Sequence, residues 1–172
     1  PEALSVQFPL VEDLMRALVL VVYPMIGVVA DVPLASGARL YAAADRVHIC
    51  TVDKDLAQCV RGDHVVLVDR RRRTTTDEAG VIEKFGVSPA QIPDLLALVG
   101  DTADGYPGIP GFGKKTAARL LVEFGSIEAI PDTSARWPAD VRGRDKLAST
   151  LAASREQAAL FKRLATLRDE PA

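Results

Sequence analysis

Two pairs of aspartates are the residues of this chain that are best suited to chemistry. Asp53 and Asp55 flank a lysine, while Asp101 and Asp104 stand three residues apart, a spacing that lets both side chains point the same way on a helical turn. Mg²⁺ and Mn²⁺ are hard cations that prefer oxygen ligands of this kind. Two such ions, about 3.5–4 Å apart, can hold the attacking and the leaving oxygen of a phosphodiester. Most such pairs, taken alone, are turn or cap residues. The four carboxylates indicate metal-assisted phosphodiester chemistry because they occur together with the hairpin described next.

A glycine-punctuated hairpin, Gly108 to Gly113, comes after the second pair, and a basic helix is predicted after it. Glycine lets backbone N–H groups approach a phosphate, and the N-terminus of the next helix adds its dipole. We expect the amides of Gly111, Gly113 and Lys114 to contact a nucleic-acid backbone without reading its sequence. The alternative is an ordinary tight turn between two helices. The full predicted DNA-binding set is Gly108, Gly111, Gly113, Lys114, Lys115, Thr116 and Arg119.

Composition restricts the class of protein without identifying a partner. The 172 residues are 48% hydrophobic and 26% charged, which fits one globular domain with a substantial core. The net charge of −2 is not a nucleic-acid signature, so any such signal must be local. Arg70 to Arg73 form a basic run, and residues 114 to 172 carry 11 Lys and Arg against 8 Asp and Glu. Such clusters are equally typical of a solvated face.

The remaining reactive residue types indicate structural roles. Cys50 and Cys59 are predicted to be buried free thiols in a reducing compartment, with a disulfide as the less favoured alternative. His48 and His64 lie in or beside strand-like runs and are interpreted as structural. The apolar stretch over residues 18–25 is too short to span a bilayer, and we expect no membrane partner and a cytoplasmic location.

Hydrophobic periodicity predicts an α/β fold with a partial, mostly parallel sheet and flanking helices, followed by an all-helical region. Expected strands cover residues 18–23, 47–52 and 65–69, and Asp53 and Asp55 come after the second strand. Sites in open α/β sheets form beyond the carboxyl ends of strands, which favours a site there. Helices are expected over 10–17, 35–44, 77–85, 114–124 and 144–167, with short helices opening at Pro89 and Pro93 and a loop over 131–143. The last helix should turn Leu147, Leu151, Phe161 and Leu164 inward.

Two segments carry a family resemblance. The segments DKDLAQ at 53–58 and GDTADGYPGIPGFGKKTA at 100–117 closely resemble the 5′–3′ exonuclease/flap endonuclease family, which includes the N-terminal nuclease domain of bacterial DNA polymerase I. GVSPAQIPDLLALVGD at 86–101 fits the same block, and the resemblance runs from about residue 1 to 170.

The resemblance implies an α/β nuclease-like (PIN-like) core over residues 1–92 and a helix–three-turn–helix region over 93–172. The second region would grip duplex DNA and hold a K⁺ ion on main-chain carbonyls. The implied activity is divalent-metal-dependent phosphodiester hydrolysis at 5′ ends or flaps, with Mg²⁺ or Mn²⁺ as the ion. The implied catalytic and metal-binding residues are Asp31, Asp53, Asp55, Asp101 and Asp104.

The chain departs from the family pattern in two places. Where the family has Glu-Ala-Asp-Asp at the opening of a helix, this chain has Val29-Ala30-Asp31-Val32, and valine cannot ligate a cation. Residues 1–20 match a family segment that lies beyond most of the helical arch, so we expect a core that is incomplete at its N-terminus. Unpaired strand edges would then favour association or instability.

Three functions remain open. The first is a 5′ nuclease that is weakly active because two ligands are replaced. The second is an inactive module that still grips duplex DNA through the hairpin. The third, a helix-hairpin-helix glycosylase, is disfavoured because the Asp53–Asp55 pair and the early strands have no place in it. The oligomeric state is not indicated.

Overall fold

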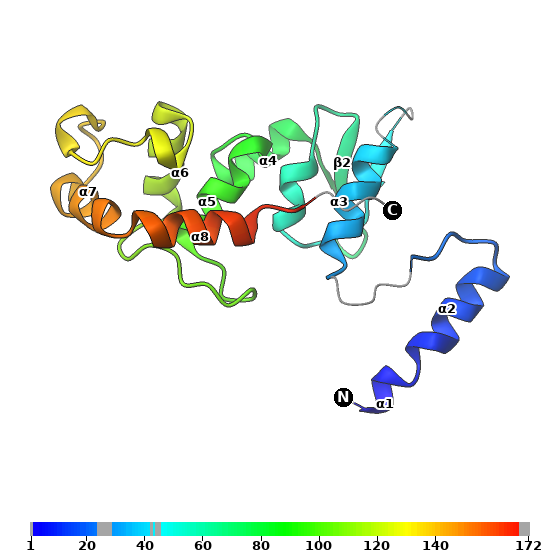
Figure 1. Cartoon of the computed structure of the whole chain (residues 1–172). Helices are drawn as coiled ribbons and strands as arrows, with labels where there is room; N and C mark the ends of the chain where they lie inside the picture. The colour runs from blue at the N-terminus through cyan, green and yellow to red at the C-terminus, as the bar shows by residue number, and fades with distance from the viewer. Residues whose placement is uncertain (1, 24–28, 42, 44–45, 169–172) are drawn as a thin grey trace.

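The structure, a computed structural model, describes residues 2–23, 29–41, 43 and 46–168. A small sheet and the helix α3 (Asp31–Leu40) form one part of the molecule, and a group of helices forms the other (Figure 1). The helices α1 (Glu2–Ser5) and α2 (Phe8–Ala17) lie apart from both in the view of Figure 1. Fold class is therefore as expected, α/β followed by an all-helical region.

The sheet has three strands in the order β1 (Val47–Ile49), β2 (Val65–Asp69) and β3 (Thr74–Thr76). β1 and β2 are parallel, and β2 and β3 form an antiparallel hairpin. β2 is built from β-branched residues and leucine, and its first three residues are buried. The short helix η1 (Asp55–Cys59) comes after the loop that leaves β1, so the strand's carboxyl end delivers the first aspartate pair.

The core of the helical part is α5 (Ile92–Val99), whose residues 92–98 are all buried. It packs against α6 (Lys114–Phe124) and α8 (Arg155–Ala165). Its one acidic residue, Asp94, accepts a hydrogen bond from the Ile127 amide at 2.9 Å and pairs with Lys162 at 2.8 Å, which satisfies a buried charge. The other elements are η2 (Pro89–Gln91), η3 (Ile127–Ala129), η4 (Ser134–Arg136) and α7 (Arg144–Ala153).

Local capping chemistry confirms the predicted boundaries of two helices. α4 (Glu78–Phe85) begins after Asp77, whose side chain accepts from the Gly80 amide at 2.8 Å, and ends at Gly86 with φ of 78°. α6 covers the predicted residues 114–124 and ends at Gly125. In both helices the residues that set the boundary lie within one turn of it, so the sequence alone is sufficient to predict where the helix begins or ends.

The predicted strand over residues 18–23 is wrong. Leu18 and Val19 form a turn, residues 20–23 have no regular structure, and the Val19 side chain is 90% exposed. None of the described strands pairs with this segment, and a strand without a neighbour has no partner for its backbone groups. The apolar stripe of α2 is exposed as well, so the predicted helix forms without a buried residue among those described.

Other predictions need smaller corrections. The helix expected over 35–44 begins earlier, at Asp31, and ends at Leu40; residues 42, 44 and 45 lie outside the described residues. The strand expected over 47–52 ends at Ile49. The helix expected over 144–167 is divided at Ser154 into α7 and α8, and Leu164 is exposed rather than inward-facing. Arg155, the first residue of α8, donates to the carbonyl of Ile127 at 2.6 Å and so ties the start of α8 to η3.

The cysteines are free as predicted, but Cys50 is exposed and Cys59 only half-buried. Burial raises the pKa of the Cys59 thiol to about 11, which makes it a poor nucleophile. No helix among the described residues has the length and apolar character needed to cross a bilayer.

Candidate metal centre and nucleic-acid interface

Three of the predicted aspartates converge. Asp55, Asp101 and Asp104 each offer a carboxylate oxygen, and these oxygens all lie within 4.8 Å of one another. Asp55 opens η1, between β1 and β2, whereas the other two belong to the turn after α5. Segments almost fifty residues apart in the sequence therefore build one acidic cluster.

The turn that presents Asp101 and Asp104 is held by close backbone packing. The backbones of Asp101 and Tyr106 exchange two hydrogen bonds, of 2.8 and 3.0 Å. Gly100 and Gly108 have positive φ values of 89° and 74°. A Cβ on Gly108 would lie 2.4 Å from the Gly100 nitrogen, so only glycine fits there.

Asp101 is the most deeply buried member of the cluster, at 2% exposure. Its carboxylate accepts from the Ala103 amide at 3.0 Å and pairs with the Lys54 ammonium at 2.5 Å. A buried carboxylate needs such a partner, because leaving an ionised group unpaired in the interior is very unfavourable. Lys54, the middle residue of the Asp53–Asp55 motif, is thus the internal counter-charge of the cluster.

Asp55 is a buried carboxyl with a raised pKa and an oxygen that lacks a hydrogen-bond partner among the described residues. Burial raises the pKa of its carboxyl to about 7, and the nearby carboxylates of Asp104, Asp53 and Asp101 add to the rise. Its Oδ1 is buried and has no hydrogen-bond partner among the described residues. A group in this state requires either a proton or a cation, so the donor set fits a divalent metal ion.

Tyr106 was not predicted from the sequence and lies against the same cluster. Its hydroxyl is buried without a hydrogen-bond partner among the described residues, and its ring stacks on Phe161 with centroids 5.8 Å apart. Burial, followed by the charges of Asp55 and Asp101, raises the pKa of the hydroxyl, which keeps it neutral. No sequence signal identified it, because a tyrosine in a turn is usually core or surface.

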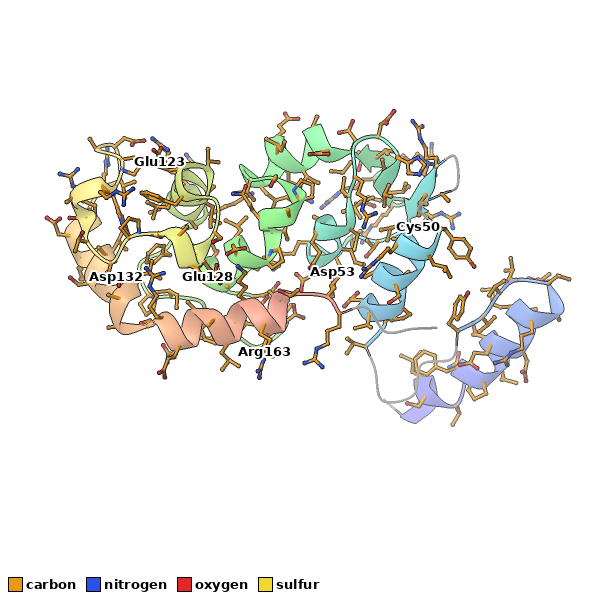
Figure 2. The ribbon with its side chains drawn as sticks, turned by 45° about the horizontal axis from the view of Figure 1, so that its top comes forward. Cys50, Asp53, Glu123, Glu128, Asp132 and Arg163 are labelled. Carbon is orange, nitrogen blue, oxygen red and sulfur yellow. The ribbon has the colours of Figure 1, made fainter. Side chains whose placement is uncertain are left out.

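Asp53 and Asp31 border this cluster. The exposed Asp53 accepts from the Asp55 amide at 3.2 Å, and Figure 2 shows it in the middle of the molecule, where the two parts meet. Asp31 begins α3, and burial together with the charges of Asp53 and Asp104 raises its pKa. The adjacent valines add no ligand: Val29 is 66% exposed and Val32 lies in the first turn of α3.

The structure distinguishes the predicted DNA-binding glycines. Gly108 is buried against Gly100, which explains that glycine by packing alone. Gly111 is exposed, with φ of 89°, and Gly113 precedes the first turn of α6 without any side-chain cap. The first amides of α6 therefore have no side-chain cap, and their predicted contact with a phosphate stays a prediction.

The basic side chains of α6 also differ from one another. Lys114 donates to the backbone carbonyl of Lys84 at the end of α4 and lies 4.9 Å from the centre of the Phe85 ring. Lys115 is exposed and forms no ion pair with any residue in the described part of the chain. Arg119 pairs with Glu123 at 2.9 Å and with Asp140 at 3.2 Å. Thr116 is half-buried in the first turn of α6.

Lys84 is a basic residue of this surface that sequence reasoning missed. It lies on α4, yet its ammonium is 5.1 Å from the Phe85 ring, and it lines with Lys114, Lys115 and Arg119 one groove of about 470 Å³. The one sequence signal at Lys84 was its place in the last turn of a predicted helix that ends before Gly86. The groove lies between α4 and α6, and four basic side chains line it.

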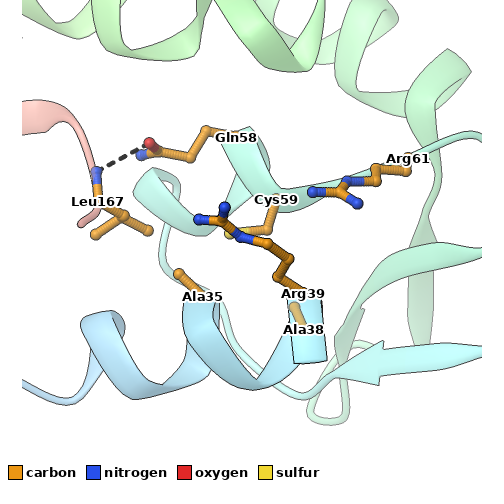
Figure 3. A pocket seen from close by; sticks show the side chains of 7 residues that line it. All are labelled: Ala35, Ala38, Arg39, Gln58, Cys59, Arg61 and Leu167. Carbon is orange, nitrogen blue, oxygen red and sulfur yellow. Dashed lines mark hydrogen bonds between the residues drawn. The ribbon is translucent and has the colours of Figure 1, made fainter. Parts of the chain in front are cut away.

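A smaller cavity of about 140 Å³ lies between α3, η1 and the chain beyond α8 (Figure 3). The side chains of Arg39, Arg61 and Cys59 line it, and the Gln58 amide oxygen accepts from the backbone of Leu167 at 3.0 Å. The same side chain donates to the carbonyl of Ala165 at 3.0 Å. The cavity therefore marks where the end of the chain is fastened to the sheet-containing part.

Comparisons with known proteins agree with this geometry. The family model "5'-3' exonuclease, N-terminal resolvase-like domain" matches residues 1–86, and "5'-3' exonuclease, C-terminal SAM fold" matches residues 87–171. DNA polymerase I of Pseudomonas aeruginosa is 41% identical over 99% of this chain, although the chain spans only 19% of that protein.

Solved structures of bacteriophage T5 proteins share the fold. The T5 5′-exonuclease with bound zinc matches with a TM-score of 0.78 and 25% identity, over 96% of this chain and 61% of that one. The T5 flap endonuclease in complex with DNA and metal ions matches with a TM-score of 0.75 and 24% identity, over 90% of this chain and 56% of that one. This chain is thus shorter than each protein that it resembles.

Proposed function

The chain belongs to the 5′–3′ exonuclease family, and we propose that it hydrolyses phosphodiester bonds at 5′ ends or flaps of duplex DNA with the help of a divalent metal ion. The observation that carries this proposal is the convergence of Asp55, Asp101 and Asp104 within 4.8 Å. The proposal includes the expected cytoplasmic location, with which a DNA substrate is compatible. The glycosylase alternative does not fit this family.

Five aspartates are assigned to the metal centre. Asp55, Asp101 and Asp104 would hold an ion directly, and Asp53 and Asp31 would complete its surroundings. A bound Mg²⁺ or Mn²⁺ would lower the pKa of a water molecule and neutralise charge on the phosphate. Family proteins include one solved with zinc bound and one solved with DNA and metal ions, which supports a metal-dependent role here.

The DNA contact is assigned to the hairpin and the groove beside it. The open amides at the start of α6 and the unpaired Lys115 would contact the phosphate backbone. Lys84 and Lys114 would add positive charge to the same surface. The proposal includes K⁺ on main-chain carbonyls of the hairpin and a sequence-independent grip on duplex DNA.

A second candidate function rests on the valines at positions 29 and 32. They stand where the family pattern has carboxylates, beside Asp31, and offer no lone pair to a metal ion. Activity is therefore expected to be weak, and the alternative is an inactive module that binds structured DNA. The DNA-contacting surface is the same in both candidates.

A cleavage assay on a 5′-flap duplex separates these functions. The protein is incubated with Mg²⁺ or Mn²⁺ or with a chelator, beside the variant Asp53→Asn/Asp55→Asn. Metal-dependent cleavage that the variant lacks supports the nuclease, and binding without cleavage supports the inactive module. Absence of both binding and cleavage would contradict the proposal.

A further inference from the structure

The turn between β2 and β3 consists of four successive arginines, Arg70 to Arg73, all exposed. We call it the arginine turn. It carries four of the 21 basic residues of a chain whose net charge is −2. None of these four arginines belongs to the carboxylate cluster or lines the groove beside α6.

The arginine turn has a defined backbone rather than that of a loose loop. The Asp69 carboxylate accepts from the amide of Arg71 at 3.0 Å and from the amide of Arg72 at 2.9 Å. Arg73 has a φ of 57°, and the strand pairing resumes at once between Asp69 and Thr74. The aspartate thus fixes the turn through its backbone amides, while the four arginines remain exposed.

Charge on the turn is not balanced within the described part of the molecule. Its one ion pair is the long contact of 3.7 Å between Arg72 and Asp69, in which the arginine side chain is 80% exposed. Two arginines elsewhere in the described chain have closer partners: Arg155 lies 2.7 Å from Asp132, and Arg119 lies 2.9 Å from Glu123. Adjacent like charges repel one another, so the arginine turn is suited to an anionic partner.

The chemistry of the turn selects the partner. Guanidinium groups bind phosphate oxygens through paired N–H donors. No aromatic or aliphatic side chain lies among the four arginines to stack on a base or enter a lipid layer, and the next residues are threonines. We propose that the arginine turn is a second phosphate-binding surface, which contacts the DNA backbone away from the groove between α4 and α6. This inference rests on the proposed function.

The connecting chain limits how far apart the two surfaces lie. α4 begins after β3 and ends beside the groove, where Lys114 contacts the carbonyl of Lys84. Eight helical residues span about 12 Å, and three strand residues about 10 Å. With the one residue between these elements, the arginine turn lies at most about 25 Å from the groove, which corresponds to about seven base pairs of duplex. One duplex could thus contact both surfaces.

The test compares salt dependence of DNA binding between matched variants. Arg70→Gln/Arg71→Gln removes two charges from the turn and keeps the Asp69 contacts, and Arg163→Gln/Arg168→Gln removes two exposed charges elsewhere. Binding to a duplex of about 30 base pairs is measured across a salt series. The slope of log K against log salt is negative, and each lost phosphate contact reduces its magnitude by about 0.9. We expect the magnitude of the slope to fall by about 2 in the turn variant and to stay unchanged in the control variant.

Three outcomes would overturn the inference. An unchanged slope in the turn variant would exclude phosphate contacts there, and an equal fall in both variants would show an effect of net charge alone. Failure of the unmodified protein to bind any duplex would contradict the proposed function as well. A lower slope for Lys115→Ala together with an unchanged turn variant would leave the proposed function standing and refute only the second surface. Urea unfolding of each variant checks that the fold is intact.

Discussion

Asp55 is the residue in which the fold and the chemistry conflict most. It is 7% exposed, its Oδ1 has no hydrogen-bond partner among the described residues, and other carboxylates surround it. Burying such a group is costly unless a proton or a cation neutralises it. Its position is therefore better explained by metal binding than by stability.

This conflict predicts a pH dependence in the absence of metal. The pKa of Asp55 is about 7 in the folded protein and 3.8 in the ordinary reference state. Between these values the folded protein binds more protons than the unfolded chain, so stability falls as pH rises from about 4 to about 7 and then levels off. Urea unfolding in a chelator across this range should show the fall in the unmodified protein and a smaller one in Asp55→Asn. Parallel profiles would contradict the assignment.

At the scale of elements, α4 and α6 are joined by Lys114. The lysine that sequence reasoning assigned to DNA donates to the end of α4 and lies against Phe85, whereas its neighbour Lys115 is free of ion pairs in the described part of the chain. A helix C-terminus favours a cation, and an ammonium over an aromatic ring adds a further attraction. Two adjacent lysines on one helix therefore have different surroundings.

Single alanine variants should show whether the roles of the two lysines differ. Lys114→Ala is expected to lower the free energy of unfolding by about 1 kcal/mol, because it removes the cation from both partners. Lys115→Ala should leave stability unchanged and lower the salt slope of DNA binding by about 1. Thermal unfolding and fluorescence anisotropy measure the two effects. Equal stability of both variants would argue against a stabilising role of the Lys114 contacts with α4 and Phe85.

Elements defined by local chemistry were predictable, and those that depend on distant partners were not. The cap at Asp77, the stop at Gly86 and the limits of α6 depend on residues within one helical turn. Residues 18–23 have strand-forming composition but no neighbouring strand among those described. Near the break at Ser154, Arg155 contacts η3, and no local pattern predicts that contact.

At the scale of the whole molecule, the candidate site depends on bringing together three stretches of chain. The sequence identified Asp31, the Asp53–Asp55 pair and the Asp101–Asp104 pair, because carboxylate spacing and family resemblance are local signals. It could not identify Lys54 as the counter-charge, Tyr106 beside the cluster or Lys84 in the groove. The first two contacts form only once η1 has packed against α5, and the third only once α4 lies beside α6.

Direct titration with Mn²⁺ tests the central claim, that carboxylates from distant segments bind a divalent ion together. Calorimetry on the unmodified protein is compared with Asp104→Asn, whose exposed side chain can be changed without disturbing the core, and with the matched surface variant Asp63→Asn. We predict saturable binding by the unmodified protein and by Asp63→Asn, and an affinity at least about tenfold lower in Asp104→Asn, which corresponds to about 1.4 kcal/mol. Absence of binding by the unmodified protein, or equal affinity in all three proteins, would contradict the account.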